Sequence, residues 1–155
     1  MALIFLGKST CPICHNILHQ GEDVRGFPSL TGNIKDKLYI FSDKGCHQKC
    51  VDAHPFGKMA WDFADEAHKK FMEKKWWAGG NVITDYRNFY GLGMLTSDET
   101  EELFQYNFLT LDVNNIATWK DKEHFLNVAK KFIDERKWQD WNPDYNFWER
   151  VFCGY

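Results

Sequence analysis

The chain of 155 residues lacks the long apolar run of a membrane span, since no stretch approaches about 18 consecutive apolar residues. The only apolar run near the start, residues 2–6, is shorter than the roughly 7 residues of a signal-peptide core and has no basic flank. We therefore expect a cytoplasmic protein that does not associate with membranes. In that reducing compartment, paired cysteines are more typical of metal ligands than of disulfides.

Clusters of proline and glycine are also missing. The four prolines and eleven glycines are scattered, and hydrophobic residues make up 44% of the chain. Both features are typical of a chain that folds throughout rather than of a disordered or low-complexity segment. The length is close to that of one domain with its own core, so we expect a single folded unit.

Excess positive charge is absent as well, because the formal net charge is -3. Binding to DNA or RNA relies on clustered lysine and arginine, so this balance argues against a nucleic-acid partner. Residues 91–155 carry 12 acidic against 7 basic side chains. Four of the acidic residues fall within five positions: Asp98, Glu99, Glu101 and Glu102. Such a cluster is typical of a solvated turn, and the alternative is a docking surface for a basic partner.

Two pairs of metal-ligand residues have the same spacing. Cys11 and Cys14 form a C-x2-C pair, and His47 and Cys50 form the second pair. Zn²⁺ takes four sulfur or nitrogen ligands in a tetrahedron, and two local pairs joined by a hairpin supply such a set. The sequence therefore predicts one structural zinc site. Because protein atoms fill all four positions in this arrangement, we do not expect the metal to catalyse a reaction.

The fourth ligand has an alternative in Cys46. Cys46 and Cys50 are four residues apart, so on a helix they would face the same way and complete a site of four cysteines. We favour His47, because its two-residue spacer matches the spacing of ligand pairs in zinc sites. A cysteine at position 46 is also accommodated as a small buried apolar group. A simpler alternative is that these cysteines are ordinary buried residues of a reduced protein.

Apolar positions recur with helical spacing in two segments, which predicts long amphipathic helices over 56–77 and 122–138. A shorter helix is expected over 46–53, with Asp43 as its capping residue. Three apolar runs predict short strands: 2–6, 38–41 and 103–109. The expected fold class is α+β, with short antiparallel strands beside two long helices.

The predicted order of knuckle, hairpin and ligand-bearing helix resembles a treble-clef zinc finger over residues 11–53. The wider pattern of Cys11, Cys14, His47 and Cys50, with Phe-Ser-Asp at 41–43 and His-Pro at 54–55, is similar to a group of small bacterial CxxC…HxxC zinc-finger proteins. Cys46 departs from that pattern, where an apolar or aromatic residue is expected. We expect one domain over 1–155, with a zinc-finger subregion at 8–54 and a helical and β-rich body at 55–155.

Some proteins of this group resemble immunity proteins that neutralise a cognate bacterial toxin. The resemblance therefore implies a protein-binding, zinc-stabilised scaffold without enzymatic activity, whose partner is a basic toxin domain. The acidic residues Asp98, Glu99, Glu101 and Glu102 are the candidate partner-binding residues. One alternative is a nucleic-acid-binding zinc-finger regulator, which would need a basic face. Another is an enzyme whose site carries no recognisable motif.

Overall fold

The structure is a computed structural model that describes residues 2–74, 83–85, 89–112 and 114–138. These residues form an α+β fold with three α-helices, two short 3₁₀ helices and two small antiparallel sheets. The elements run in the order β1 (Val24–Gly26), β2 (Gly45–His47), α1 (Gln48–Ala53), α2 (Gly57–Lys74), β3 (Ile83–Asp85), β4 (Phe89–Leu92), η1 (Glu102–Tyr106), β5 (Thr110–Asp112), η2 (Ile116–Thr118) and α3 (Lys122–Asp134). No helix among them combines the length and the apolar character that crossing a bilayer requires.

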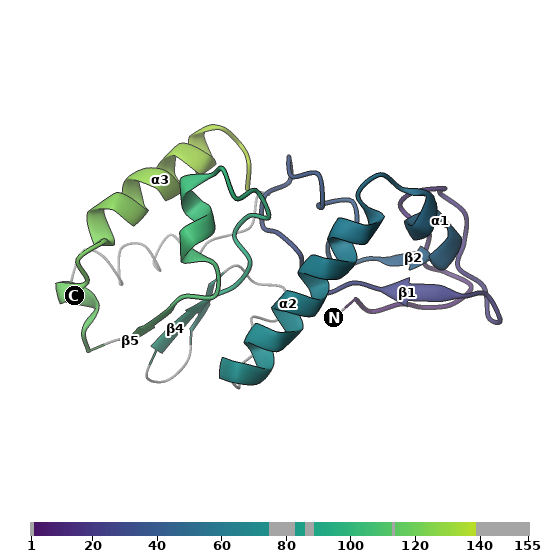
Figure 1. Ribbon diagram of the computed structural model, residues 1–155, viewed down its shortest axis with the longest axis horizontal. Helices are drawn as coiled ribbons and strands as arrows, with labels where there is room; N and C mark the ends of the chain where they lie inside the picture. Colours follow the sequence, from purple (N-terminus) through teal and green to yellow (C-terminus); the bar gives the residue numbers. More distant parts are fainter. Residues whose placement is uncertain (1, 75–82, 86–88, 113, 139–155) are drawn as a thin grey trace.

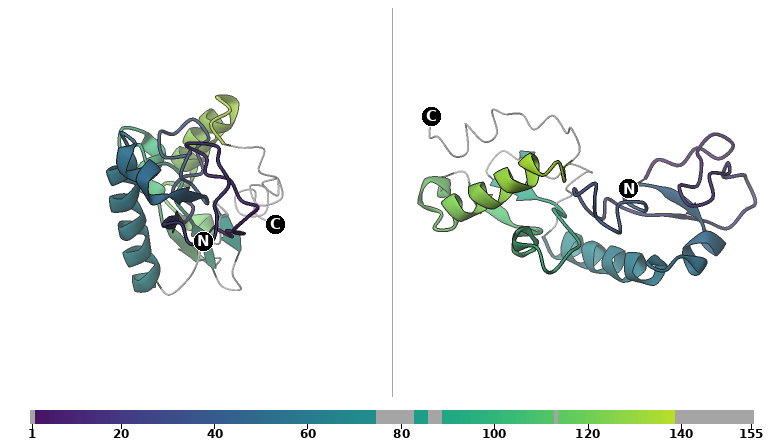
Figure 2. Two further views of the ribbon diagram at one scale, coloured as in Figure 1. Left: turned by 90° about the vertical axis from the view of Figure 1, so that its right-hand side faces the viewer. Right: turned by 90° about the horizontal axis from the view of Figure 1, so that it is seen from above.

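The described part of the molecule is elongated, and α2 lies between its two ends. Figure 1 shows β1, β2 and α1 at one end, with α3, β4 and β5 at the other. The view from above in Figure 2 shows the same separation. β1 pairs with β2, and the second sheet has the order β3-β4-β5. Each end has its own cluster of buried hydrophobic side chains.

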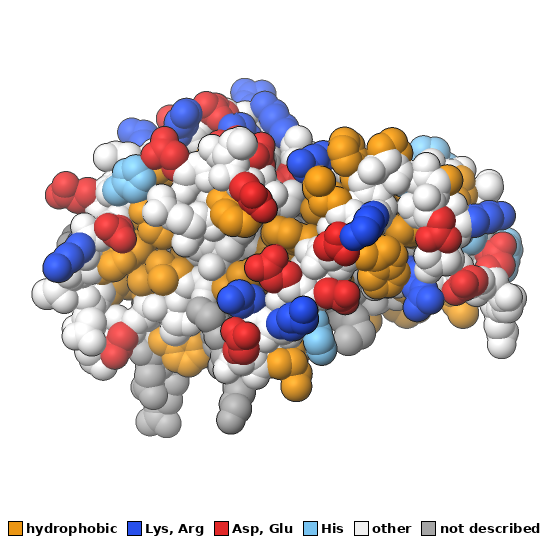
Figure 3. All heavy atoms as spheres, viewed as in Figure 1, with side chains coloured by type: hydrophobic (Ala, Val, Ile, Leu, Met, Phe, Trp, Pro, Cys, Tyr) orange, Lys and Arg blue, Asp and Glu red, His pale blue; other side chains and the backbone are white. Residues whose placement is uncertain are grey.

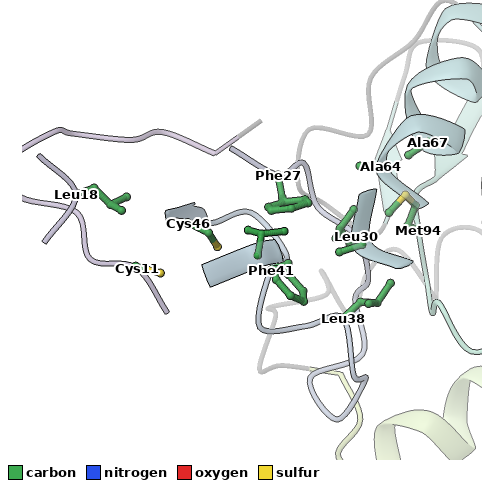
Figure 4. Close-up of a cluster of buried hydrophobic side chains, with 12 residues drawn as sticks. Cys11, Leu18, Phe27, Leu30, Leu38, Phe41, Cys46, Ala64, Ala67 and Met94 are labelled. Atoms are coloured by element: carbon green, nitrogen blue, oxygen red, sulfur yellow. The ribbon is translucent and has the colours of Figure 1, made fainter. Parts of the chain in front are cut away.

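The first core lies against α2 and contains the aromatic pair Phe27 and Phe41, whose ring centroids are 5.3 Å apart. α2 contributes three small buried residues, spaced by four and three positions on one helical face: Ala60, Ala64 and Ala67. Figure 4 shows the two phenylalanine rings between Cys11 on one side and Ala64 and Ala67 of α2 on the other. The helix predicted over 56–77 is confirmed as α2, and residues 75–77 lie outside the described residues.

The second core lies against α3, which contributes four buried residues at helical spacing: Phe125, Val128, Ala129 and Phe132. The sequence predicted that this helix reaches Trp138, but it ends at Asp134. Arg136 has a left-handed φ of 52°, and the Lys137 N–H donates to the Phe132 carbonyl at 3.0 Å. These features form the backbone motif that commonly closes helices, which is why the helix stops before the apolar periodicity does.

The β1–β2 hairpin is built around two opposed glycines. Its register pairs Val24 with His47 and Gly26 with Gly45. Because glycines have no side chain, Ile4 packs over them: a Cβ atom on Gly45 would lie only 2.8 Å from the Ile4 Cδ1 atom. The hairpin that carries His47 is therefore covered by the first segment of the chain.

Residues 31–38 join the two cores. The Asp36 carboxylate accepts hydrogen bonds from the Ser97 N–H at 2.8 Å and from the Ser97 hydroxyl at 2.5 Å. The Ile34 N–H donates to the Lys137 carbonyl at 2.5 Å. Because these bonds connect positions that are distant in the sequence, they fix the first core relative to the second.

Three segments that were predicted as strands adopt other structures. Residues 2–6 form no strand, and residues 38–41 form consecutive turns in which Leu38 and Phe41 are buried. Residues 103–109 contain most of η1, whose buried side chains are Leu103 and Tyr106. In both of the latter segments the buried residues are three positions apart, which fits tight turns and 3₁₀ helices rather than the two-residue period of a strand.

Candidate metal centre

The first ligand pair lies in a tight turn. The Cys11 carbonyl accepts a hydrogen bond from the His15 N–H, and the Cys11 N–H donates to the Asn16 carbonyl, both at 2.8 Å. His15 has a left-handed φ of 60°, which lets the chain reverse direction after Cys14. His15 itself is exposed. The turn therefore holds the two cysteines of the C-x2-C pair close together.

The second ligand pair lies where β2 runs directly into α1. His47 is the last residue of β2 and the N-cap residue of α1, and Cys50 lies in the first turn of that helix. The expected helix over 46–53 therefore starts two residues late, because residues 45–47 pair with β1 instead. Asp43 does not cap it, since Asp43 has a left-handed φ of 54° in the preceding turn.

The structure brings the two pairs into one group. One ligand atom from each of Cys11, Cys14, His47 and Cys50 lies within 4.8 Å of every other. A tetrahedron with Zn–S distances of about 2.3 Å has neighbouring sulfurs about 3.8 Å apart, so a contraction of about 1 Å would suffice. The Cys14 Sγ and His47 Nδ1 atoms are already 3.3 Å apart. Three sulfurs and one imidazole nitrogen at this spacing fit one metal ion, and the four residues can hold one.

The thiols of the group differ in their tendency to ionise. Burial by itself would raise the pKa of the Cys11 thiol, but hydrogen bonds from the Cys14, His47 and Ile13 backbone amides lower that pKa to about 6. Burial and the neighbouring Cys14 side chain raise the pKa of Cys50 to about 11. The backbone thus stabilises one thiolate, and a second negative charge beside it is unfavourable without a cation. A bound divalent ion would supply that cation.

Cys46 lies outside the group of four ligand atoms that the described residues form. It is fully buried in the first core, and burial together with the nearby Cys11 raises the pKa of its thiol to about 12. The side chains of Cys46 and His47 both lie near Cys11, but only His47 has a ligand atom within 4.8 Å of all three other members of the group. The geometry favours His47 as the member of the group.

Glu22 contacts the far side of the His47 ring. Its Oε2 atom lies 3.0 Å from His47 Nε2 and also accepts a hydrogen bond from the His19 N–H at 2.7 Å. Burial alone would lower the pKa of His47, but hydrogen bonds with Cys11, Cys14 and then Glu22 raise it. Sequence reasoning missed Glu22, because it belongs to no pair with metal-ligand spacing.

An open hollow of about 400 Å³ borders this side of His47. Its lining residues are Glu22, Asp23, His47, Gln48, Lys49 and Asp52. None of the three clustered cysteines is among them, so this hollow gives a substrate no route to the sulfur atoms. Its mixed carboxylate and lysine lining is typical of a solvated surface.

The predicted partner-binding residues lie before and at the start of η1. Asp98 accepts hydrogen bonds within its own turn, and Glu99 is exposed. Glu101 forms an ion pair with Lys137 at 2.7 Å, and Glu102 lies 3.3 Å from a histidine of α3. The structure thus gives three of the four residues contacts within the chain, and their role in partner binding stays a prediction.

Comparison with family models, with curated proteins and with solved structures found no match to this chain.

Proposed function

We propose that the chain is a protein-binding module whose residues 8–54 form a treble-clef-like finger around one structural Zn²⁺. The observation that supports it is the group formed by Cys11, Cys14, His47 and Cys50, whose ligand atoms lie within 4.8 Å of one another. Three thiolates and an imidazole suit zinc better than the hard cations Mg²⁺ or Ca²⁺, which prefer oxygen ligands. With four protein ligands the ion has no open position for a substrate, so its role is to hold the fold.

The narrower form of the proposal is that the module neutralises a bacterial toxin with a basic surface. The net charge of -3 favours a basic protein partner over nucleic acid. The face drawn in Figure 3 agrees with this choice, because acidic and basic side chains are mixed over most of it rather than gathered into one extended basic patch. A nucleic-acid regulator would need such a patch.

The metal part of the proposal is tested by elemental analysis of freshly purified, reduced protein. We expect one equivalent of zinc per chain. A content well below one equivalent of any metal would contradict the proposal, and a full equivalent of another metal would correct the identity of the ion.

The binding part is tested by isolating the tagged chain from its native host and identifying stoichiometric partners by mass spectrometry. We expect one basic protein partner, and tight binding to nucleic acid at physiological salt without a protein partner would refute this part.

The acidic stretch 98–102 can then be tested against the isolated partner. Steering by exposed charges acts mainly on the association rate and weakens with salt. Neutralising the exposed Glu99 and Glu102 together should slow association severalfold at low ionic strength. Asp65→Asn with Glu66→Gln on the exposed face of α2 is the control, because it changes the net charge equally. Equal effects of the two double variants would show that only the net charge acts.

A further inference from the structure

We infer that Glu22 is a positioning residue of the metal centre, which fixes the tautomer of His47 so that its Nδ1 atom serves as the metal ligand. The inference rests on the proposed zinc site and adds a specific role for a residue outside the two ligand pairs.

The geometry places the two ring nitrogens of His47 in different surroundings. Nδ1 lies 3.3 Å from the Cys14 sulfur, inside the group of ligand atoms. Nε2 lies 3.0 Å from Glu22 Oε2, on the opposite side of the ring. The His47 side chain is only 4% exposed, whereas that of Glu22 is 37% exposed. The ring is thus held between the sulfurs and one carboxylate.

The chemistry of the two partners determines which nitrogen carries the proton. An ionised carboxylate only accepts hydrogen bonds, so the nitrogen that faces Glu22 must donate one. A neutral imidazole has one N–H group, and with the proton on Nε2 its lone pair lies on Nδ1. That lone pair points into the cluster of three sulfurs. Glu22 therefore selects the tautomer that can bind the ion.

The carboxylate is itself fixed in place. Glu22 Oε2 accepts a hydrogen bond from the His19 N–H at 2.7 Å, which closes the turn between residues 19 and 22. A carboxylate held by the backbone loses little further freedom when it orients the histidine. Hydrogen bonds of this kind commonly change metal affinity by about 10- to 100-fold when they are removed.

The test compares the Zn²⁺ affinity of the wild type with three variants by competition with a chromophoric chelator. Glu22→Ala should weaken zinc binding about 10- to 100-fold. Glu22→Gln keeps an acceptor but loses the charge, so its affinity should fall between those of the wild type and Glu22→Ala. Asp23→Ala is the matched control, because this exposed neighbour lines the same hollow and its loss changes the charge equally. It should bind zinc within about twofold of the wild type.

Nitrogen-15 NMR of the zinc-loaded protein supplies a readout that a purely structural role would not change. We expect His47 to show a metal-bound Nδ1 and a protonated Nε2 in the wild type. A metal-bound Nε2 would overturn the inference, and so would Glu22 variants that match Asp23→Ala in affinity. If Glu22→Ala fails to fold, the comparison of Glu22→Gln with Asp23→Ala decides. A wild type without zinc would instead refute the proposed function, so the two failures are distinguishable.

Discussion

Removing the proposed metal ion should unfold the finger formed by residues 8–54 and leave the second core folded. The perturbation is incubation of the reduced protein with a strong chelator, or the substitution Cys14→Ser, which deletes one of the four clustered ligands. The regular structure near the group is two strands of three residues and one helix of six. Isolated elements of this length are not stable in water, so their order depends on tertiary contacts and, as proposed here, on the ion.

The magnitudes decide the outcome. A structural Zn²⁺ contributes an apparent binding free energy of about 10–16 kcal/mol in small zinc-dependent folds. The free energy of unfolding of a whole domain is usually only about 5–15 kcal/mol. Losing the binding free energy of the ion would therefore cancel the stability of the first core. The second core is built entirely from residues at or after Leu92, and none of them belongs to the finger. We therefore expect a local rather than a global loss of structure.

Hydrogen exchange followed by mass spectrometry measures both halves in one experiment. Without metal, amides of β1, β2 and α1 should exchange at the rate of an unfolded chain, while α3 amides keep most of their protection. Adding back Zn²⁺ should restore the slow exchange in the chelator-treated sample but not in Cys14→Ser. Unchanged protection of α1 after complete metal removal would refute the reasoning, because the finger would then be stable on its own.

Further expectations concern single residues. In chelator competition, Cys46→Ala should keep a zinc affinity within a few-fold of the wild type. His47→Ala should weaken zinc binding by more than about 100-fold. The opposite ranking would assign the fourth ligand to Cys46. Gly57→Ala should lower the free energy of unfolding by about 3 kcal/mol, because the added Cβ would collide with a backbone carbonyl oxygen of α1. Urea unfolding measures this change, and an unchanged midpoint would contradict the close packing of Gly57 against α1. The hydrogen bond to Glu101 raises the pKa of Lys137 in the folded state. The ion pair therefore stabilises the folded state at pH values below the usual lysine pKa of about 10.4. This stabilisation is lost as the pH rises through the raised pKa of Lys137. Urea unfolding of wild type and Lys137→Met should therefore differ by up to about 1 kcal/mol at pH 8 and converge at high pH, whereas a difference that persists there would contradict the ion pair.

The two ligand pairs could be predicted because metal chemistry dictates local spacing. A C-x2-C turn and a residue pair at the start of a helix bring two ligand atoms together with few degrees of freedom. The long helices could be predicted for a similar reason, since α2 and α3 each bury one face with a regular period. Both signals are carried by residues that are close in sequence.

The short elements could not be predicted from local pattern. Residues 38–41 form an apolar run that resembles a buried strand, but Asp36 accepts a hydrogen bond from the Leu38 N–H at 2.9 Å and holds the segment in turns. β4 contains Gly91, which is rare in strands, and forms because both neighbouring strands pair with it. In each case a tertiary contact overrides a weak local preference.

The choice between Cys46 and His47 shows where sequence reasoning ends. Spacing on an assumed helix leaves both residues available, because positions 46 and 47 would each meet Cys50 within one turn. The structure places both in β2, and of the two only His47 joins the group of four ligand atoms, while Cys46 is buried in the first core beside Cys11. Predicting the role of Glu22 would have needed more than ligand spacing, because Glu22 contacts the nitrogen of His47 that faces away from the sulfurs. No spacing rule relates residues 22 and 47, because the turn at 19–22 and the β1–β2 pairing together bring them into contact. Metal-ligand motifs therefore mark the sulfurs and the ring, while the group that orients the ring is found only once the hairpin is folded.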